Sequence, residues 1–295
     1  LFNIMIISNA YKFTHFFSLS EKPSIESKGI LHKISTIFLG PKIYKSLVVD
    51  SLHIKHDTIQ FKSSDSLLIE SWYIPNSKNI GTVILFHGHG ANKSYLIPQA
   101  HFFYSLGYNV YMPDFRAHGN SAGETCSLGM IEYIDVQDAY NFIQQKGEKN
   151  IILYGISFGA STLLKAMEAN TIKPNKIILE MPYSTLLSGI KGKLRIMGLP
   201  EQPLSVLLAF WIGTELGTWA FNFKPVEYAK MVHCPVLLQW GILDPRVTEK
   251  ETNEIFKNLA SHNKFLVKYV YAAHENLLIK EKQKWENTVI DFLNK

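Results

Sequence analysis

The feature that most constrains this chain is an apolar, β-branched run at residues 151–156 that stops abruptly in a Gly-x-Ser-x-Gly pentapeptide centred on Ser157. Residues 160–167, which follow it, have the apolar spacing of a helix. The sequence therefore predicts a strand, a sharp turn and a helix, with a serine at the turn. Such a turn exposes the serine hydroxyl, and the backbone N–H groups that open the helix point toward it.

The glycines of the pentapeptide have a steric reason. With the serine in a strained conformation, Gly155 and Gly159 are expected to approach each other too closely to carry Cβ atoms. The pattern alone is weak evidence, because three fixed positions of such common residues recur by chance in about one chain in ten of this length. Unless an acid and a histidine follow in the right context, an ordinary turn serine is an equally good interpretation of Ser157.

Strand-like and helix-like segments alternate along most of the chain. The expected strands are 53–61, 67–74, 82–86, 108–112, 150–156, 176–181, 235–240 and 265–271. The expected helices are 95–106, 131–145, 158–170, 249–259 and one that begins near 278. This alternation predicts an α/β fold, with a mostly parallel sheet of about eight strands, helices on both faces and an antiparallel hairpin of the first two strands at one edge. Active sites in such sheets lie at the carboxyl ends of the strands.

Two parts of the chain depart from the alternation. Residues 1–47 are punctuated by proline and glycine, and we expect a short helical arm packed on a domain that spans 48–295. About fifty residues separate the strand at 176–181 from the next one. We expect a small helical cap there, at about 183–233, over the carboxyl edge of the sheet. Its aromatic residues either line a substrate pocket or only pack the cap onto the body.

Composition excludes several classes of protein. With 46% hydrophobic and 19% charged residues, the chain has the material for a globular core. Its formal charge of +5 comes from dispersed lysines without aromatic interleaving, so no nucleic-acid partner is expected. Cys126 and Cys234 lie far apart without a CxxC or a His/Cys cluster, which predicts neither a zinc site nor a disulfide framework. A reducing, cytoplasmic compartment is the expectation.

The beginning of the chain leaves an alternative open. Residues 2–7 are apolar, but the run breaks at Ser8, far short of the roughly 20 residues of a membrane span. Because the first residue is leucine, we expect a processed, trimmed or alternatively initiated product, and the apolar run could be the tail of a removed signal or anchor. An ordinary terminal helix or strand is an equally good interpretation. Membrane association or export is expected only through such a missing N-terminal segment.

A carboxylate and an imidazole follow the two strands after the cap. Asp244 comes shortly after the strand at 235–240, and His274 comes after the strand at 265–271. The order Ser157, Asp244, His274 is the one associated with a serine at a strand-to-helix elbow. The serine hydroxyl attacks only when an imidazole takes its proton, and the carboxylate fixes the tautomer of that imidazole. Three such residues at successive strand ends predict a catalytic triad.

A glycine-rich turn at residues 86–90 supplies the fourth element. It can aim the backbone N–H of His89 into the same pocket as the N–H of Phe158, which would make a two-donor oxyanion hole. His87 and His89 could also be metal ligands, but no carboxylate or third histidine lies close by, so no metal is expected. The polar segment 114–121 is interpreted as a structural brace behind this turn, with His118 outside the catalytic set.

These residues resemble the serine hydrolases of the α/β-hydrolase superfamily, and within it the esterase and aminopeptidase-like branch with a short cap. The resemblance covers 48–295 and rests on His87-Gly88, Asp114-x-Arg116-x-His118-Gly119-x-Ser121, Gly155-x-Ser157-x-Gly159, Gly241-x-x-Asp244-x-x-Val247 and His274. It implies an α/β-hydrolase fold, the triad Ser157, Asp244 and His274, oxyanion donors His89 and Phe158, and no cofactor. Two positions depart from the pattern, since Ala117 and Ala273 stand where the family often has glycine.

The expected activity is hydrolysis of small-molecule carboxylic esters through an acyl-enzyme, with short to medium acyl chains because the cap is small. Alternatives are an acyl thioesterase or protein depalmitoylase, an aminopeptidase, and a binding module that kept the fold without catalysis. An aminopeptidase needs an acidic group to hold the substrate amine, and Glu215 in the cap is the candidate. Glu180, one strand earlier than Asp244, is a rival for the triad acid, but Asp244 is favoured because it lies in a loop beyond its strand.

Overall fold

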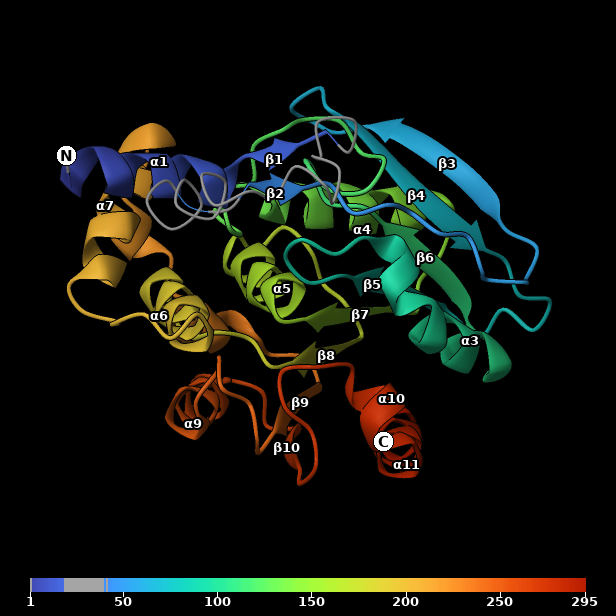
Figure 1. The fold of residues 1–295 in the computed structure, drawn as a ribbon. Helices are drawn as coiled ribbons and strands as arrows, with labels where there is room; N and C mark the ends of the chain where they lie inside the picture. Colours follow the sequence, from blue (N-terminus) through green and yellow to red (C-terminus); the bar gives the residue numbers. More distant parts are fainter. Residues whose placement is uncertain (1, 19–39, 41) are drawn as a thin grey trace.

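The computed structural model describes residues 2–18, 40 and 42–295, and its centre is one eight-stranded sheet (Figure 1). In chain order the strands are β3 (Asp57–Lys62), β4 (Leu68–Ile74), β5 (Thr82–Phe86), β6 (Asn109–Pro113), β7 (Ile151–Ile156), β8 (Lys176–Glu180), β9 (Val236–Gly241) and β10 (Lys264–Tyr269). Their spatial order is β10-β9-β8-β7-β5-β6-β4-β3. The predicted sheet of eight strands is confirmed.

Strand direction follows the prediction as well. The pairs β3–β4 and β4–β6 are antiparallel, and all the other neighbours in the sheet are parallel. The register pairs Phe86 with Gly155 and Ile156 with Glu180, so β5, β7 and β8 end at the same edge. The loops that follow these strands therefore start side by side, which brings the predicted site residues together.

Helices cover both faces of the sheet because its central strands are buried in almost every residue. On one side lie α4 (Tyr133–Gln145), α5 (Phe158–Glu168) and α9 (Glu249–Asn258), and on the other lie α3 (Ile97–Ser105), α10 (Leu277–Lys280) and α11 (Lys282–Leu293) (Figure 1). A single 3₁₀ turn, η3 (Lys93–Leu96), precedes α3. The expected helix at 95–106 therefore starts later than predicted.

The long insertion between β8 and β9 folds into helices. They are α6 (Leu186–Ile196), α7 (Leu204–Glu215), η4 (Ala220–Asn222), α8 (Pro225–Tyr228) and η5 (Ala229–Met231). The first helix of the insertion begins with a capping box, in which Thr185 and Ser188 bond each other's backbone N–H groups. Over the part of the chain that the structure describes, no single helix has the length and apolarity to cross a membrane. Two segments joined at a bend, Leu204–Glu215 and Ala220–Met231, have that length and apolarity only when they are taken together.

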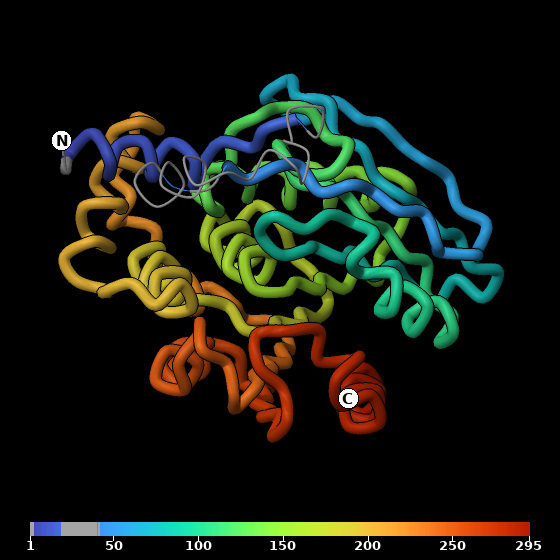
Figure 2. Tube along the Cα trace, viewed as in Figure 1, coloured from blue at the N-terminus to red at the C-terminus, as the bar shows by residue number. Residues whose placement is uncertain are grey.

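The N-terminal segment joins the insertion. Helix α1 (Phe2–Thr14) packs across α7, as both Figure 1 and Figure 2 show. It leads into β1 (Phe16–Phe17), which pairs in parallel with β2 (Ile43–Tyr44) in a small second sheet that was not predicted. A helix is present in the arm expected at 1–47, and residues 1, 19–39 and 41 of that arm lie outside the described residues.

Candidate active site

Ser157 occupies the sharp turn between β7 and α5 that the sequence predicts. Its backbone has φ +52° and ψ −112°, a conformation that residues other than glycine rarely adopt. A Cβ on Gly155 would lie 2.8 Å from the backbone N of Ala160, and a Cβ on Gly159 would lie 2.5 Å from the carbonyl O of Phe86. The first contact is the predicted one across the elbow. The second differs from the prediction, because Gly159 makes room for the end of β5.

The three predicted triad residues meet in one hydrogen-bonded chain. The Oγ of Ser157 donates to Nε2 of His274 over 2.8 Å, and Nδ1 of His274 donates to Oδ2 of Asp244 over 2.6 Å. The other oxygen of Asp244 accepts the backbone N–H groups of Arg246 at 2.7 Å and Val247 at 3.0 Å. Three hydrogen bonds therefore hold the carboxylate in place, and its side chain is fully buried.

The two backbone donors predicted for an oxyanion hole lie beside the serine. His89 and Phe158 line the same cavity as Ser157. Neither of their backbone amides donates a hydrogen bond to another described residue. The N–H of Phe158 belongs to the first turn of α5, where backbone amides have no partner within the helix. Both amides are thus available to an anion that forms next to the Ser157 hydroxyl.

Glu180, the rival acid, lies elsewhere. Its carboxylate is completely buried and accepts hydrogen bonds from the indole of Trp285 and the amide of Gln239. No hydrogen bond joins its carboxylate to His274 in the described part of the chain, whereas its backbone carbonyl accepts the N–H of Ser157 at 2.7 Å. The geometry therefore favours Asp244 as the partner of His274. Burial raises the pKa of Glu180 to about 7.

We expect Glu180→Gln to change how the stability of the protein depends on pH. A carboxyl whose pKa rises from 4.5 to about 7 on folding keeps its proton in the folded state while the unfolded chain loses it, so stability falls as pH rises through that window. The loss amounts to about 3 kcal/mol above pH 7. Glutamine carries no charge, so the Glu180→Gln variant should not lose this stability. Its free energy of unfolding minus that of the wild type should therefore be larger at pH 8 than at pH 5. Urea unfolding at the two pH values measures this difference, and an equal difference at both would contradict it.

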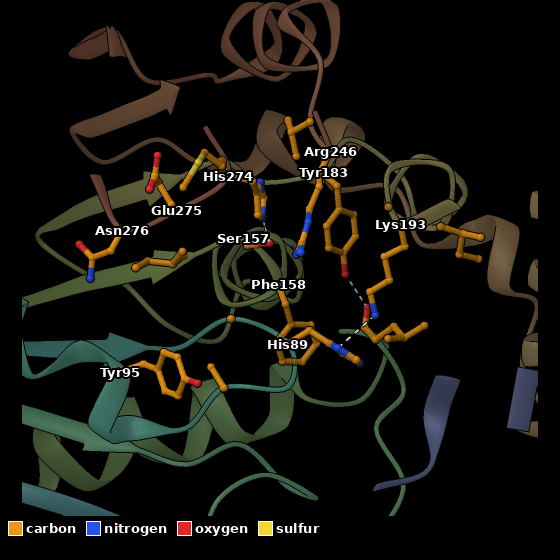
Figure 3. Close-up of a pocket in the computed structure, with 18 of the residues that line it drawn as sticks. His89, Tyr95, Ser157, Phe158, Tyr183, Lys193, Arg246, His274, Glu275 and Asn276 are labelled. Carbon is orange, nitrogen blue, oxygen red and sulfur yellow. Dashed lines mark hydrogen bonds between the residues drawn. The ribbon is translucent and has the colours of Figure 1, made fainter. Parts of the chain in front are cut away.

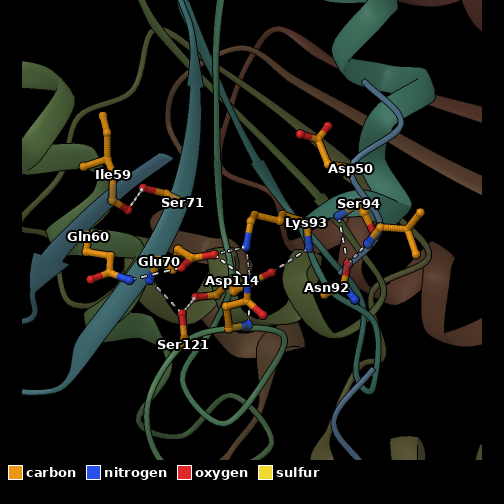
Figure 4. Close-up of polar contacts among 12 residues, drawn as sticks. Asp50, Ile59, Gln60, Glu70, Ser71, Asn92, Lys93, Ser94, Asp114 and Ser121 are labelled. Atoms are coloured by element: carbon orange, nitrogen blue, oxygen red, sulfur yellow. Dashed lines mark hydrogen bonds and ion pairs between the residues drawn. The ribbon is translucent and has the colours of Figure 1, made fainter. Parts of the chain in front are cut away.

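The predicted brace behind the oxyanion turn consists of a buried ion-pair cluster (Figure 4). The ammonium of Lys93 lies 2.5 Å from Asp114 and 3.0 Å from Glu70. Asp114 also accepts the backbone N–H groups of Lys93 and Asn120, and its carbonyl accepts the hydroxyl of Ser121. These bonds tie the loop after β6 to the start of η3, which directly follows the oxyanion turn.

The rest of the polar segment has a structural role as well. Arg116 forms a bidentate pair with Asp135 and a second pair with Asp65. Ala117, which departs from the family pattern, adopts φ +62°, the left-handed region that favours glycine. His118 is buried and donates through Nδ1 to the carbonyl of Arg116, so it has no part in the triad. Ala273, the other departure, does not have a positive φ.

His87 is a structural histidine rather than a free metal ligand. Its Nδ1 donates to the carbonyl of Gly88 at 2.8 Å, and its Nε2 accepts the backbone N–H of Phe115 at 3.1 Å. Burial lowers the pKa of His87 to about 4, which keeps the ring neutral. Because both of its ring nitrogens are engaged, His87 fixes the oxyanion turn against the loop after β6.

Ser157 and His274 open onto a cavity of about 430 Å³ between the sheet edge and α6 (Figure 3). Its walls are mostly apolar and include Leu128, Met181 and Ile190. None of the aromatic residues between 204 and 223 lines it, so of the two alternatives for the cap aromatics, the one that places them in the pocket does not hold for this part of the cap. The aromatic walls come from Tyr95, Tyr183, Phe158 and Phe13 of α1.

The acid proposed for holding a substrate amine is also remote from the cavity. Glu215, at the end of α7, accepts the hydroxyl of Thr14 and lies 2.9 Å from Nδ1 of His15. It fastens the insertion to α1. Two cations, Lys193 and Arg246, line the cavity instead, and neither was singled out from the sequence. Only the position of Arg246, two residues after the triad acid, could have indicated it.

Comparison with known proteins shows similarity over part or most of the chain. Residues 77–201 match a family model described as serine aminopeptidase, S33. The chain is 25% identical to YqkD of Bacillus subtilis over 90% of its own length and 92% of that protein. It is 28% identical to YfhR of Escherichia coli K12, with the match covering 37% of this chain and only 40% of YfhR.

Solved structures show the same fold. An esterase of Pyrococcus furiosus, Pf2001, superposes with a TM-score of 0.71 at 23% identity, over 85% of this chain and 96% of the esterase. At that level of identity the superposition establishes the architecture. The chain therefore has the α/β-hydrolase fold, and over residues 77–201 it is similar to the family described as serine aminopeptidase, S33.

Proposed function

We propose that the protein is a serine hydrolase that cleaves carboxylic esters of small molecules through an acyl-enzyme intermediate. The observation that supports this most directly is the unbroken chain from Asp244 through His274 to Ser157, with distances of 2.6 Å and 2.8 Å. A nucleophile, a base and an orienting carboxylate in this order are the parts that acyl transfer requires. The apolar cavity beside them would hold the acyl group.

Acylation would use the three side chains and the two backbone amides. As the Oγ of Ser157 bonds to the ester carbonyl carbon, its proton passes to Nε2 of His274. The carbonyl oxygen becomes an anion that the N–H groups of His89 and Phe158 stabilise, each such donor contributing roughly 3 kcal/mol in related sites. The bond from carbon to the ester oxygen then breaks, and the leaving alkoxide takes the proton from His274. Asp244 stabilises the imidazolium in between.

Deacylation repeats the same steps with water. A water molecule gives a proton to Nε2 of His274 while its oxygen attacks the acyl carbon. When the second tetrahedral intermediate collapses, the bond to the Oγ of Ser157 breaks and that oxygen recovers the proton from His274. A carboxylic acid leaves, and the free enzyme is restored.

A panel of 4-nitrophenyl esters tests this proposal. We expect turnover of the acetate, butyrate and hexanoate, with kcat/KM falling at least about tenfold for the palmitate, because a cavity of about 430 Å³ is at the small end of ligand sites. Prior treatment with a fluorophosphonate should abolish turnover, since it modifies an activated serine. Oxygen and thiol esters of equal chain length are compared in the same assay.

Three results would contradict parts of the proposal. An optimum at sixteen carbons, or a thioester preferred over its oxygen ester, would indicate an acyl thioesterase with a larger pocket. Hydrolysis of amino-acid 4-nitroanilides in place of the esters would indicate an aminopeptidase. A wild-type protein that hydrolyses nothing and does not react with the fluorophosphonate would be a binding module.

A further inference from the structure

Two cationic side chains face the cavity beside the serine. Lys193 reaches it from α6, and Arg246 reaches it from the loop after β9. In Figure 3 the side chain of Arg246 runs down between Tyr183 and Ser157, and Lys193 lies on the same side of the cavity, above His89. The remaining walls near them are apolar. Two positive groups in such a place need an explanation, since an ordinary acyl pocket has no use for them.

The ammonium of Lys193 has only neutral partners among the described residues. It donates to Nδ1 of His89 over 3.1 Å and lies 4.0 Å above the ring of Phe13. Burial keeps the pKa of His89 well below its usual value, so this ring accepts and carries no compensating charge. Burial also lowers the pKa of Lys193 to about 7, and the nearby charge of Arg246 acts in the same direction. An anion in the cavity would offset both the burial of the Lys193 charge and its repulsion by Arg246.

The position of Arg246 is fixed by its backbone rather than by an ion pair. Its N–H donates to Asp244, and its carbonyl contacts the guanidinium of Arg195 at 3.4 Å. Helix α6 approaches this loop closely, because a Cβ on Gly192 would lie 2.5 Å from the carbonyl O of Arg246. Within the described ranges the guanidinium of Arg246 has no acidic partner. The same turn that orients the triad acid therefore presents this cation to the cavity.

The carboxylate that lines the cavity does not neutralise the two cations. Glu275 lies beyond His274 from them in Figure 3, and its side chain is 43% exposed. It accepts the backbone N–H of Ala273 and lies 3.6 Å from Lys280. The charge of the cavity is therefore divided, with a positive side at Lys193 and Arg246.

We propose that Lys193 and Arg246 form a subsite for an anionic group of the substrate, a carboxylate or a phosphate that the ester carries besides its scissile bond. The planar guanidinium can bind such a group through two parallel N–H donors, and the ammonium adds a point charge at the other side. The inference rests on the proposed ester hydrolysis and narrows it to anionic esters. It also disfavours a substrate whose amine would have to enter next to these cations.

Pairs of esters that differ only in charge test the subsite. One pair is mono-4-nitrophenyl adipate and 4-nitrophenyl hexanoate, with the charge on the acyl side. The other is 4-acetoxybenzoate and its methyl ester, with the charge on the leaving group. For each pair the ratio of kcat/KM, anionic over neutral, is measured for the wild type and for Arg246→Gln, Lys193→Met, Arg246→Lys and Lys191→Met.

We expect the ratio to fall about tenfold or more in Arg246→Gln and Lys193→Met for at least one pair, because each loses a partly desolvated charge contact. Arg246→Lys should recover part of the ratio. Lys191 lies two residues before Lys193 on α6 but does not line the cavity, so Lys191→Met, with the same change in net charge, should leave the ratio at the wild-type value. Inhibition of hexanoate turnover by adipate and by butyl phosphate then separates carboxylate from phosphate recognition.

The subsite and the proposed function fail in different ways. If both pairs are hydrolysed and every ratio stays within about twofold of the wild type, the subsite is wrong and ester hydrolysis stands. If no ester is hydrolysed by the wild type, the proposed function fails first. Retained fluorophosphonate labelling of each variant shows that a changed ratio does not come from loss of the fold.

Discussion

Replacing Ser157 with alanine is expected to lower kcat for 4-nitrophenyl butyrate by at least about 10⁴-fold and to abolish fluorophosphonate labelling. Removal of the nucleophile alone costs about 10⁶-fold in a protease with the same three residue types. The residual rate would come from binding and from the N–H groups of His89 and Phe158, which the exchange leaves in place. Steady-state kinetics and gel fluorescence of the labelled protein measure the two losses.

The fold should survive this exchange. The strained φ of +52° at residue 157 is as acceptable to alanine as to serine, and the N–H bond to the carbonyl of Glu180 does not involve the side chain. The thermal midpoint should therefore stay close to that of the wild type. Ser105, exposed at the end of α3, provides the matched control, since Ser105→Ala should keep both turnover and labelling. Equal turnover in Ser157→Ala and Ser105→Ala would remove Ser157 from the mechanism.

Asp244→Asn is expected to lower kcat by about 10⁴-fold, as the same exchange does in a serine protease triad. The structure explains why the amide cannot adapt. Oδ1 of residue 244 accepts two backbone N–H groups, from Arg246 and Val247, so an asparagine would keep its oxygen there and turn its NH₂ group toward His274. The NH₂ group favours the His274 tautomer that carries its proton on Nε2. In that tautomer Nε2 cannot accept the proton of Ser157.

Glu180→Gln is the control for this exchange. It makes the same replacement of a carboxylate by an amide at the end of the neighbouring strand, where the side chain contacts Trp285 and Gln239. It should retain most of the activity and show its effect in the pH dependence of stability. Nearly full activity in Asp244→Asn together with loss of activity in Glu180→Gln would transfer the role of the acid to Glu180.

The sequence alone was sufficient to predict the sheet and the three residues that are hydrogen-bonded to one another at its edge. Parallel strands that end in one line bring their following loops together, so the places of Ser157, Asp244 and His274 could be derived from strand ends alone. The contact of Gly155 across the elbow was similarly local, whereas Gly159 packs against the end of β5, which the pentapeptide alone does not indicate.

The walls of the cavity could not be derived in this way. Helix α7 is apolar around its whole circumference, so its pattern does not say which side faces the sheet, and its aromatic residues pack away from the cavity. Phe13 reaches the cavity only because α1 folds across the insertion, a contact between distant segments that no local pattern records. Lys193 resembles any surface lysine of an amphipathic helix until α6 is placed against the loop of Arg246.

The position of Phe13 over Lys193 has a consequence for how such enzymes diverge. The proposed catalytic residues follow strands of the sheet, whereas one wall of the cavity comes from the first helix of the chain, far outside the matched region 77–201. Two descendants of one ancestor could therefore share every residue of the catalytic machinery and still accept different compounds, after exchanging nothing but their first helix. Part of the substrate range in this lineage should therefore depend on the leading segment, which comparisons confined to residues 77–201 do not cover.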